Sequence, residues 1–486
     1  MLFTSLQYLV FLPVIVFLFW VLPRAWRLPM LLVASYYFYA SFIWQFLALI
    51  LPMTLFNWLW GKLLVKDHSN KKILGAGIAI NLVILAVFKY ANFFADSLGA
   101  IFPLVGAVNP HWTFNIILPL GISFFTFEFI HYLFEIYRGK KPIDSFVLFA
   151  LFAAFFPTQI AGPIKRYPDF VAQMQADNKL KLSDFDEGVP LIVIGLAKKL
   201  LLADNLAIFV QMGMDHPDLY SAPELWLFAY AFAFQIYFDF SGYTDVGRGS
   251  ALLFGYHIPI NFNMPYIAAN MADFWHRWHV SLSTWLRDYL FIPLGGSRGG
   301  RWLTNRNLFL TMALGGLWHG ASWNFVIWGI FHGLALIVHR EFVQWRSTAS
   351  GVKEIFENKF FTPFWSYFSI FLTFHAVCIG WVFFRIQDIN AAFLMVKRML
   401  LMRPFFSMAA PEHFLVLRPE MPVVVPVVMV MVALLLLTNL PVSMLNEKRF
   451  FQRTPALVQA VFCTVLIVAM ITFQPDNSAP FIYFQF

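Results

Sequence analysis

Long apolar runs separated by short polar stretches cover most of the chain. A helix needs about 20 mainly apolar residues to cross a bilayer. The stretch 30–64 is long enough for two passes, and we expect a break near Pro52. The pattern predicts an all-α polytopic membrane protein with about 11–13 membrane segments in a single domain of residues 1–486. Predicted segments begin near Phe3, Leu28, Ile73, Trp112, Phe146, Val189, Pro223, Asn307, Thr362, Met421 and Pro455.

The composition agrees with this pattern. Hydrophobic residues make up 60% of the 486 positions and charged residues 12%, whereas a soluble protein carries about 25% charged residues. This excludes a disordered chain and an ordinary cytosolic enzyme. The net charge of +8 is explained by Lys and Arg kept in cytoplasmic loops, and no basic block is long enough to track nucleic acid. Cys378 and Cys463 lie in apolar runs and are interpreted as small hydrophobic residues.

Loop charges predict the orientation. Arg24 and Arg27 follow the first apolar run, and no small-residue cleavage site comes after it, so a retained first span with an external N-terminus is expected. Lys448, Arg449 and Arg453 mark a late cytoplasmic loop, which places the C-terminus outside as well. Three earlier basic groups are also expected on the cytoplasmic side: Lys62, Lys66, Lys71 and Lys72; Arg138, Lys140 and Lys141; and Lys165, Arg166, Lys179 and Lys181.

A single apolar stretch, 146–164, separates the second and third basic groups. A full crossing would put one group outside, so we expect a re-entrant hairpin broken at Pro157, Gly162 and Pro163. Irregular backbone at membrane depth is tolerated when it is buried in protein or lines a cavity. The alternative is a proline-kinked helix whose flanking charges break the rule.

Polar side chains concentrate between residues 235 and 340. Asp239, Asp245 and Arg248 adjoin an apolar span, where ionisable groups are costly and tend to be functional; a satisfied Asp–Arg pair at a helix end is an equal alternative. Between 273 and 293, apolar residues recur at spacings of three and four, which predicts one amphipathic helix. On it His276 and His279 would share a face.

Metal and phosphate binding are weakly supported by this region. Zinc would need a third ligand beside His276 and His279, such as His319, and no metal is expected. The loop 295–301 carries Arg298 and Arg301, which could hold the phosphates of a nucleotide-like donor. From the residues alone, an ordinary cytoplasmic turn is favoured. Gly295-Gly-Ser-Arg-Gly299 lacks the strand and helix of a nucleophile elbow, so it is interpreted as a chance match.

His319 lies in an apolar, glycine-rich segment, 314–329. A histidine in such a place is most often a hydrogen-bonded structural residue. Small neighbours would let a substrate or a second helix approach closely, and a neutral imidazole in a low-dielectric site is a usable general base. The sequence therefore offers candidate bases and no hydrolase nucleophile.

These residues resemble the membrane-bound O-acyltransferase family, in its bacterial branch of alginate and peptidoglycan O-acetyltransferases and teichoic-acid D-alanylation subunits. The resemblance runs nearly from end to end. The matching segments are Phe11-Leu-Pro13, Ala34-Ser-Tyr-Tyr-Phe-Tyr-Ala40, Gln159-Ile-Ala-Gly-Pro163, Tyr237-Phe-Asp-Phe-Ser-Gly-Tyr-Thr-Asp245, Trp278-His-Val-Ser-Leu-Ser-Thr-Trp-Leu-Arg-Asp-Tyr-Leu-Phe-Ile-Pro-Leu-Gly-Gly296 and Leu317-Trp-His-Gly-Ala321.

The resemblance implies a ring of membrane helices around a central tunnel, with a catalytic core at about 235–340. His319 matches the family's catalytic histidine and His279 its second active-site histidine. Tyr483, in the aromatic tail 474–486, resembles a tyrosine proposed to carry the acyl group. Acetyl-CoA is the implied donor, with no permanently bound cofactor. Expected contacts to substrate or donor lie in or beside the motifs: Gln159, Asp288, Arg298, Arg301, Trp318 and Asn324.

The resemblance further implies a bacterial inner-membrane protein, in contact with lipid, that passes acetyl to a separate extracytoplasmic SGNH-type transferase. The acceptor, alginate or another exopolysaccharide or peptidoglycan, stays open. The alternatives without covalent chemistry are a transporter or flippase, which buried charges and broken helices also fit, and a scaffold for envelope polysaccharide modification. Loss of activity in a folded His319→Ala variant would favour the enzyme.

Overall fold

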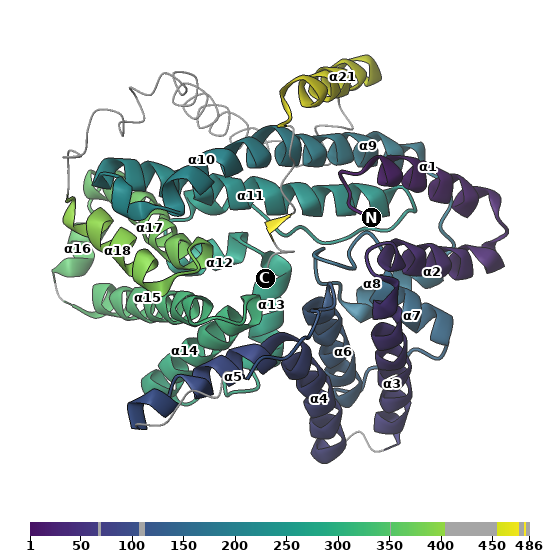
Figure 1. The fold of residues 1–486 in the computed structure, drawn as a ribbon, viewed down its shortest axis with the longest axis horizontal. Coiled ribbons are helices and arrows are strands. Elements are labelled where there is room, and N and C mark those ends of the chain that lie inside the picture. The colour runs from purple at the N-terminus through teal and green to yellow at the C-terminus, as the bar shows by residue number, and fades with distance from the viewer. Residues whose placement is uncertain (67–69, 106–111, 350, 404–453, 476–480, 483–486) are drawn as a thin grey trace. The chain divides into compact units, whose positions relative to one another are not determined.

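The computed structural model describes residues 1–66, 70–105, 112–349, 351–403, 454–475 and 481–482. Within these ranges every regular element is a helix (Figure 1), which confirms the all-α prediction. The chain forms two compact units. Unit 1 contains residues 1–192 and 243–259, and unit 2 contains residues 193–242 and 260–486. The predicted span near Met421 and the loop 448–453 lie outside the described residues.

Five described helical stretches are long and apolar enough to cross a bilayer, in agreement with a multi-pass membrane protein. They are Trp44–Val65, Lys71–Gly99, Trp323–Thr348, Phe361–Arg385 and Ala456–Phe473. The total of about 11–13 segments stays a prediction. The span from Trp323 was not predicted separately, because Asn324 and His332 interrupt its apolar pattern.

Unit 1 is built from helices that alternate with short 3-10 and π turns. Two predicted boundaries are wrong. Pro52 lies inside α3, and the chain breaks earlier, at residues 41–46. The segment from Trp112 is non-helical until α6 begins, after Pro119 and Gly121, and the φ of Gly121 is +75°.

The elements of unit 1 are α1 (Leu6–Val21), α2 (Arg24–Ala40), η1 (Trp44–Phe46), α3 (Leu47–Val65), α4 (Lys71–Leu85), η2 (Ala86–Tyr90), α5 (Ala91–Gly99), η3 (Phe102–Val105), α6 (Ile122–Tyr137), α7 (Phe146–Ala154) and α8 (Tyr167–Gln175).

The stretch predicted as a re-entrant hairpin is a short helix followed by irregular backbone. α7 has nine residues, about 13 Å at 1.5 Å per residue, which is less than half of a bilayer core. It ends at Ala154, and residues 155–166 form turns before α8 begins. Nearly every residue from 148 to 165 is buried. The irregular backbone therefore lies inside protein, as a re-entrant segment requires.

Lys165 is not a loop charge, and that interpretation is wrong. Its side chain is 1% exposed, and Nζ lies 2.7 Å from Glu128 Oε1 on α6. The same ammonium donates to Thr158 Oγ1 at 2.7 Å. A buried charge persists when it is paired and hydrogen-bonded. Lys165 therefore ties the turn after α7 to α6.

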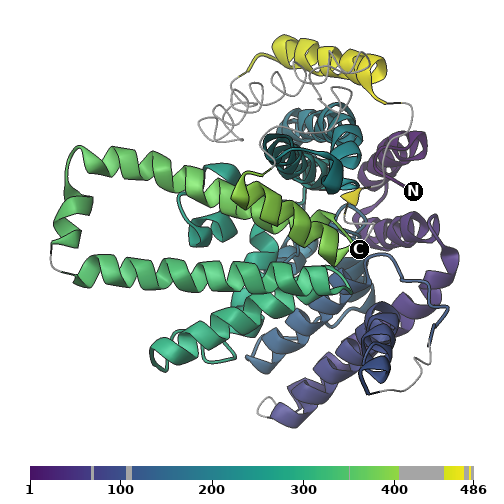
Figure 2. The same ribbon diagram turned by 60° about the vertical axis from the view of Figure 1, so that its left-hand side comes forward.

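Unit 2 holds the last turn of α9, most of α11, and the polar region between residues 235 and 340 except for residues 243–259. α14 and α15 pack side by side, and α15, α16 and α17 form a hairpin (Figure 2). Gly316 and Gly329 allow the close approach of α14 and α15. The elements are α9 (Leu182–Ala197), η4 (Lys198–Ala203), α10 (Asp204–Met214), η5 (Pro217–Leu219), α11 (Ala222–Leu252), η6 (Pro265–Ile267), α12 (Met271–Arg277), α13 (Val280–Leu286), η7 (Arg287–Phe291), α14 (Gly300–His319), α15 (Trp323–Thr348), α16 (Val352–Glu357), α17 (Phe361–Arg385), α18 (Ile389–Leu401) and α21 (Ala456–Phe473).

Candidate active site

His319 is the last residue of α14 and is only 5% exposed. Aromatic rings surround its imidazole: the ring centroids of Trp318, Trp328 and Phe384 lie 4.9, 5.0 and 5.4 Å away. These rings come from α14, α15 and α17, so three helices of unit 2 position the histidine. An imidazole enclosed by aromatic rings lies in a low-dielectric environment, where histidine is a usable general base.

His279 lies at a break that the sequence pattern did not reveal. The predicted helix 273–293 is interrupted, because His279 adopts φ +43° and ψ +55° between α12 and α13. Only a few per cent of residues other than glycine have positive φ. Asn261 stabilises the break, since its carbonyl oxygen accepts the Val280 N–H at 3.0 Å and its side-chain Oδ1 accepts the Ser281 N–H at 3.2 Å.

The break separates the two histidines of the HxxH pair. His279 is fully buried, whereas His276 is exposed, so the expectation that they share a face is wrong. The apolar face itself is confirmed, since it is buried along its length. Its members are Trp275, Trp278, Leu282, Trp285, Leu286 and Tyr289.

Trp318 contacts both candidate catalytic histidines. Its ring centroid lies 6.5 Å from that of His279 and 4.9 Å from that of His319. Phe240 of α11 also packs against His279, with the ring centroids 4.7 Å apart. Burial lowers the pKa of His279 to about 3, so this imidazole is neutral at physiological pH. The structure thus brings together three of the predicted site residues in one aromatic cluster of unit 2.

The remaining predicted contacts in unit 2 are spread more widely. Arg298 is exposed in the turn after η7. Arg301, in the first turn of α14, is paired with Glu341 at 2.6 Å and is 68% exposed. Asp288 accepts from the neighbouring Arg287 Nε at 2.8 Å. None of these described contacts involves either candidate histidine.

Asn324 has a structural role. Its side chain is 4% exposed, and its amide Nδ2 donates to the carbonyl oxygens of Ile386 and Gln387. These bonds tie the start of α15 to the residues that follow α17. Because α15 carries Trp328, which packs on His319, the two Asn324 hydrogen bonds fix one wall of the aromatic cluster.

Two predicted residues stand apart from this cluster. Gln159 belongs to unit 1, in the turn after α7, and is 2% exposed. Its side-chain amide has no hydrogen-bond partner among the described residues. Tyr483 lies outside the described residues, although Phe481 and Ile482 immediately before it are described.

His332 is a buried histidine to which sequence reasoning gave no role. It is 0% exposed, and its ring lies 4.7 Å from Trp328 and 5.3 Å from Trp275. Trp328 therefore contacts both His319 and His332. The only sequence signal for this arrangement was the concentration of Trp and His between 318 and 332.

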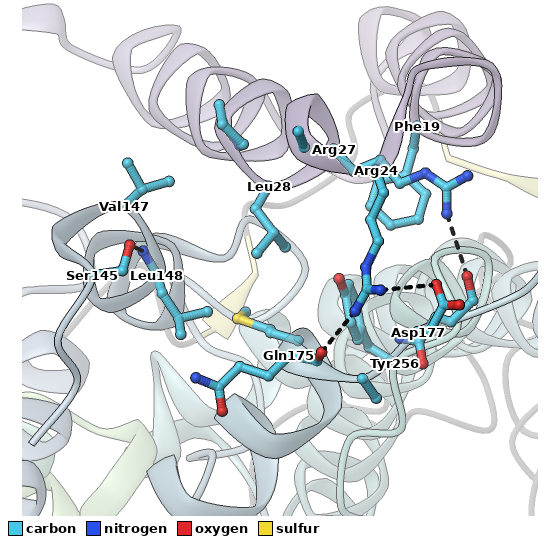
Figure 3. A pocket seen from close by; sticks show the side chains of 15 residues that line it. Phe19, Arg24, Arg27, Leu28, Ser145, Val147, Leu148, Gln175, Asp177 and Tyr256 are labelled. Carbon is cyan, nitrogen blue, oxygen red and sulfur yellow. Dashed lines mark hydrogen bonds and ion pairs between the residues drawn. The ribbon is translucent and has the colours of Figure 1, made fainter. Parts of the chain in front are cut away.

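A pocket of about 690 Å³ in unit 1 contains none of the predicted site residues (Figure 3). Arg24 and Arg27 line it, and both hold the chain after α8. Arg24 donates to the Gln175 carbonyl at 3.1 Å and lies 3.5 Å from the Asp177 carboxylate, while Arg27 donates to the Asn178 carbonyl at 3.3 Å.

Comparison with known proteins identifies the family. The family model for membrane-bound O-acyltransferases matches residues 136–383, which include both candidate histidines. The chain is 42% identical over 408 residues to a probable alginate O-acetylase of Azotobacter vinelandii, covering 82% of this chain and 78% of that protein. It is 35% identical over 408 residues to a peptidoglycan O-acetyltransferase of Helicobacter pylori, covering 78% and 73%. It is 32% identical over 301 residues to a teichoic acid D-alanyltransferase of Bacillus subtilis, covering 59% and 74%.

The helical fold, the buried histidines and these matches lead to one conclusion: the chain belongs to the membrane-bound O-acyltransferase family and is an acyltransferase.

Proposed function

We propose that this acyltransferase takes acetyl from cytoplasmic acetyl-CoA and passes it across the inner membrane for O-acetylation of an envelope polysaccharide. The observation that carries the proposal is the buried aromatic cluster around His319, in which Trp318 also contacts His279. Relatives named as alginate O-acetylase and peptidoglycan O-acetyltransferase support acetyl as the acyl group and a polysaccharide as the final acceptor.

His319 acts as the general base of the transfer. Its imidazole removes the proton of an acceptor hydroxyl while the hydroxyl oxygen attacks the thioester carbonyl of acetyl-CoA. The new C–O bond forms, the C–S bond breaks, and the sulfur of coenzyme A takes up a proton. His279 is held neutral by burial, so it can serve as a hydrogen-bond partner to the reacting groups at physiological pH.

The first acceptor in this proposal is the phenolic hydroxyl of Tyr483. The acetyl ester would then be passed to a separate extracytoplasmic SGNH-type transferase, which delivers it to alginate, another exopolysaccharide or peptidoglycan. An outward-facing C-terminus is the position that such a relay requires, and the charge pattern predicts it.

A pair of histidine variants tests the base. His319→Ala should abolish acetylation, measured as acetate released by mild alkali from the exopolysaccharide and peptidoglycan fractions of complemented deletion cells. His276→Ala is the matched control, because His276 is exposed and outside the cluster. Comparable amounts of both proteins in the membrane show that folding is preserved. Full acetylation by His319→Ala would overturn the proposed role.

Tyr483→Phe tests the relay. This change removes only the phenolic oxygen and should abolish polysaccharide acetylation. Tyr367→Phe, at a side chain that is 77% exposed on α17, is the control and should leave acetylation unchanged. Wild-type acetylation by Tyr483→Phe would refute the tyrosine intermediate while leaving the role of His319 intact.

A further inference from the structure

Unit 2 contains a buried charged cluster outside the histidine site, formed by Lys199 of η4, Asp204 of α10 and Asp239 of α11. Lys199 Nζ lies 2.7 Å from Asp204 Oδ1 and 2.7 Å from Asp239 Oδ1. All three side chains are at most 3% exposed. One ammonium faces two carboxylates, so the cluster has more acceptor oxygens than the lysine alone can satisfy.

The C-terminal segment supplies a further donor. The backbone N–H of Ile482 donates to Asp239 Oδ2 at 2.8 Å. The ring centroid of Phe481 lies 4.8 Å from Lys199 Nζ, a distance typical of a cation–π contact. Phe481 is 2% exposed and Ile482 5%, so both residues are enclosed by the unit and are not merely laid on its surface.

Ile482 also belongs to the apolar core of unit 2. The same buried cluster contains Leu206 of α10 and Ile236 of α11. The polar contact through the backbone and the apolar contact through the side chain therefore act on the same residue. Losing this residue would uncover apolar surface and deprive a buried carboxylate oxygen of its donor, and both losses are unfavourable.

The other end of the segment is fixed to the same helices. α21 packs against η4, and Asn205 Nδ2 donates to the carbonyl oxygen of Phe473, the last residue of α21, at 3.2 Å. The chain from Phe473 to Ile482 is thus attached at both ends to the region around η4 and the start of α10.

We infer that the Lys199–Asp204–Asp239 cluster is a peptide-binding site, and that its ligand is the chain's own C-terminal segment through Phe481 and Ile482. The site recognises a backbone N–H by a carboxylate oxygen and an aromatic ring by an ammonium group. The consequence of this docking for acyl transfer rests on the proposed function. Docking fixes Ile482, the residue directly before Tyr483, which is the proposed acyl carrier. Lys199 and Asp239 are then positioning residues that do not touch the substrate.

A cysteine reporter measures docking directly. Ile482→Cys keeps the backbone N–H and places a thiol at a buried position. It is introduced into the full chain with Cys463→Ala; the remaining Cys378 is fully buried. The measured quantity is the rate of maleimide labelling of the purified protein in detergent, without any acyl donor.

Asp239→Leu and Lys199→Met should each increase this rate about tenfold or more, because hydrogen bonds to charged groups are among the strongest in proteins. Lys198→Met, the neighbouring lysine of the same π turn, is the matched control and should label like the parent. Equal rates in all of these proteins would overturn the inference.

Removal of one member of a buried ion cluster can prevent folding, so a second set of variants leaves the cluster intact. Ile482→Pro removes the N–H that bonds Asp239, whereas Ile482→Val keeps it. With the reporter moved to Phe481→Cys, a position that is 2% exposed, the proline variant should be labelled about tenfold faster than the valine variant. Equal labelling of the two would contradict the docking contact.

The same proteins separate docking from acetyl transfer. Faster labelling together with lost acetylation supports both the docking site and the proposed relay. Faster labelling with unchanged acetylation supports the docking site and overturns the relay through this segment. Unchanged labelling overturns the docking site, whatever the acetylation measurement shows.

Discussion

The contact between α14 and α15 makes Gly316→Ala a sharp test of how closely the position of His319 is controlled. A Cβ atom added at Gly316 would lie 2.8 Å from the Gly329 Cα and 2.9 Å from the Gly329 nitrogen, and closer still to the Phe325 carbonyl oxygen. Ordinary van der Waals contact begins at 3.4 Å. The obstructing atoms are backbone, so the helices must separate by at least about 0.6 Å, the difference between these distances.

The expected cost follows from this displacement. Overpacking lowers the free energy of unfolding by about 1–3 kcal/mol. The obstacle at Gly316 is rigid backbone, so we expect Gly316→Ala to lie at the upper end of this range. Replacing glycine by alanine in a helix returns up to about 1 kcal/mol, which leaves a net destabilisation of about 2 kcal/mol. His319 follows Gly316 by three residues on the same helix, so a displacement of the helix also moves the histidine. Misplacement of a reacting group by about 1 Å can lower a rate about 100-fold, so we expect acetyl transfer to fall about 10- to 100-fold.

The assay compares Gly316→Ala with Gly75→Ala. Gly75 lies in α4, and an added Cβ there meets nothing within 4 Å, so its variant should keep the parent's acetate release and be up to about 1 kcal/mol more stable than the parent. Thermal unfolding in detergent gives the stability difference, and released acetate gives the transfer rate. If Gly316→Ala retained both the thermal midpoint and the acetate release of Gly75→Ala, the reasoning from helix contact to histidine position would be refuted.

Three further variants test other contacts. Lys165→Met leaves Glu128 buried without its cation and should destabilise unit 1 by about 3–5 kcal/mol, while Lys165→Met with Glu128→Leu should recover most of the loss in chemical denaturation. His279→Gly should be more stable by about 1–2 kcal/mol than His279→Ala, because φ is +43° at this position; equal thermal midpoints would contradict a strained break. Asn324→Ala leaves the buried carbonyl group of Ile386 without this donor and should cost about 1–3 kcal/mol, whereas an exposed-surface alanine variant should not change the midpoint.

Much of the fold class and part of the site follow from local pattern. The apolar runs predicted a helical membrane protein, and the placement of His319 beside glycines in an apolar segment singled it out as a candidate base. The apolar face around Trp278 was also predicted from its spacing. These features depend on residues close together in the sequence, so periodicity and composition are sufficient to reveal them.

The features that sequence reasoning missed depend on distant residues. Lys165 looked like a loop charge because its partner, Glu128, is 37 positions away. Lys199 lay unnoticed in an apolar stretch, since Asp239 is 40 positions away and Ile482 is farther still. The break at His279 is held by Asn261, which belongs to another segment of the chain. Pairing across such separations leaves no periodic trace in one sequence.

The Glu128–Lys165 pair has a consequence for the order of biosynthesis. Glu128 leaves the ribosome 37 residues before Lys165, an interval of about 2–7 s at 5–20 residues per second. During that time α6 carries a carboxylate whose partner has not yet been made. Because burial of either charge alone is costly, α6 is expected to finish its burial only when the turn after α7 has emerged. The two segments then enter the nascent protein as one assembly step.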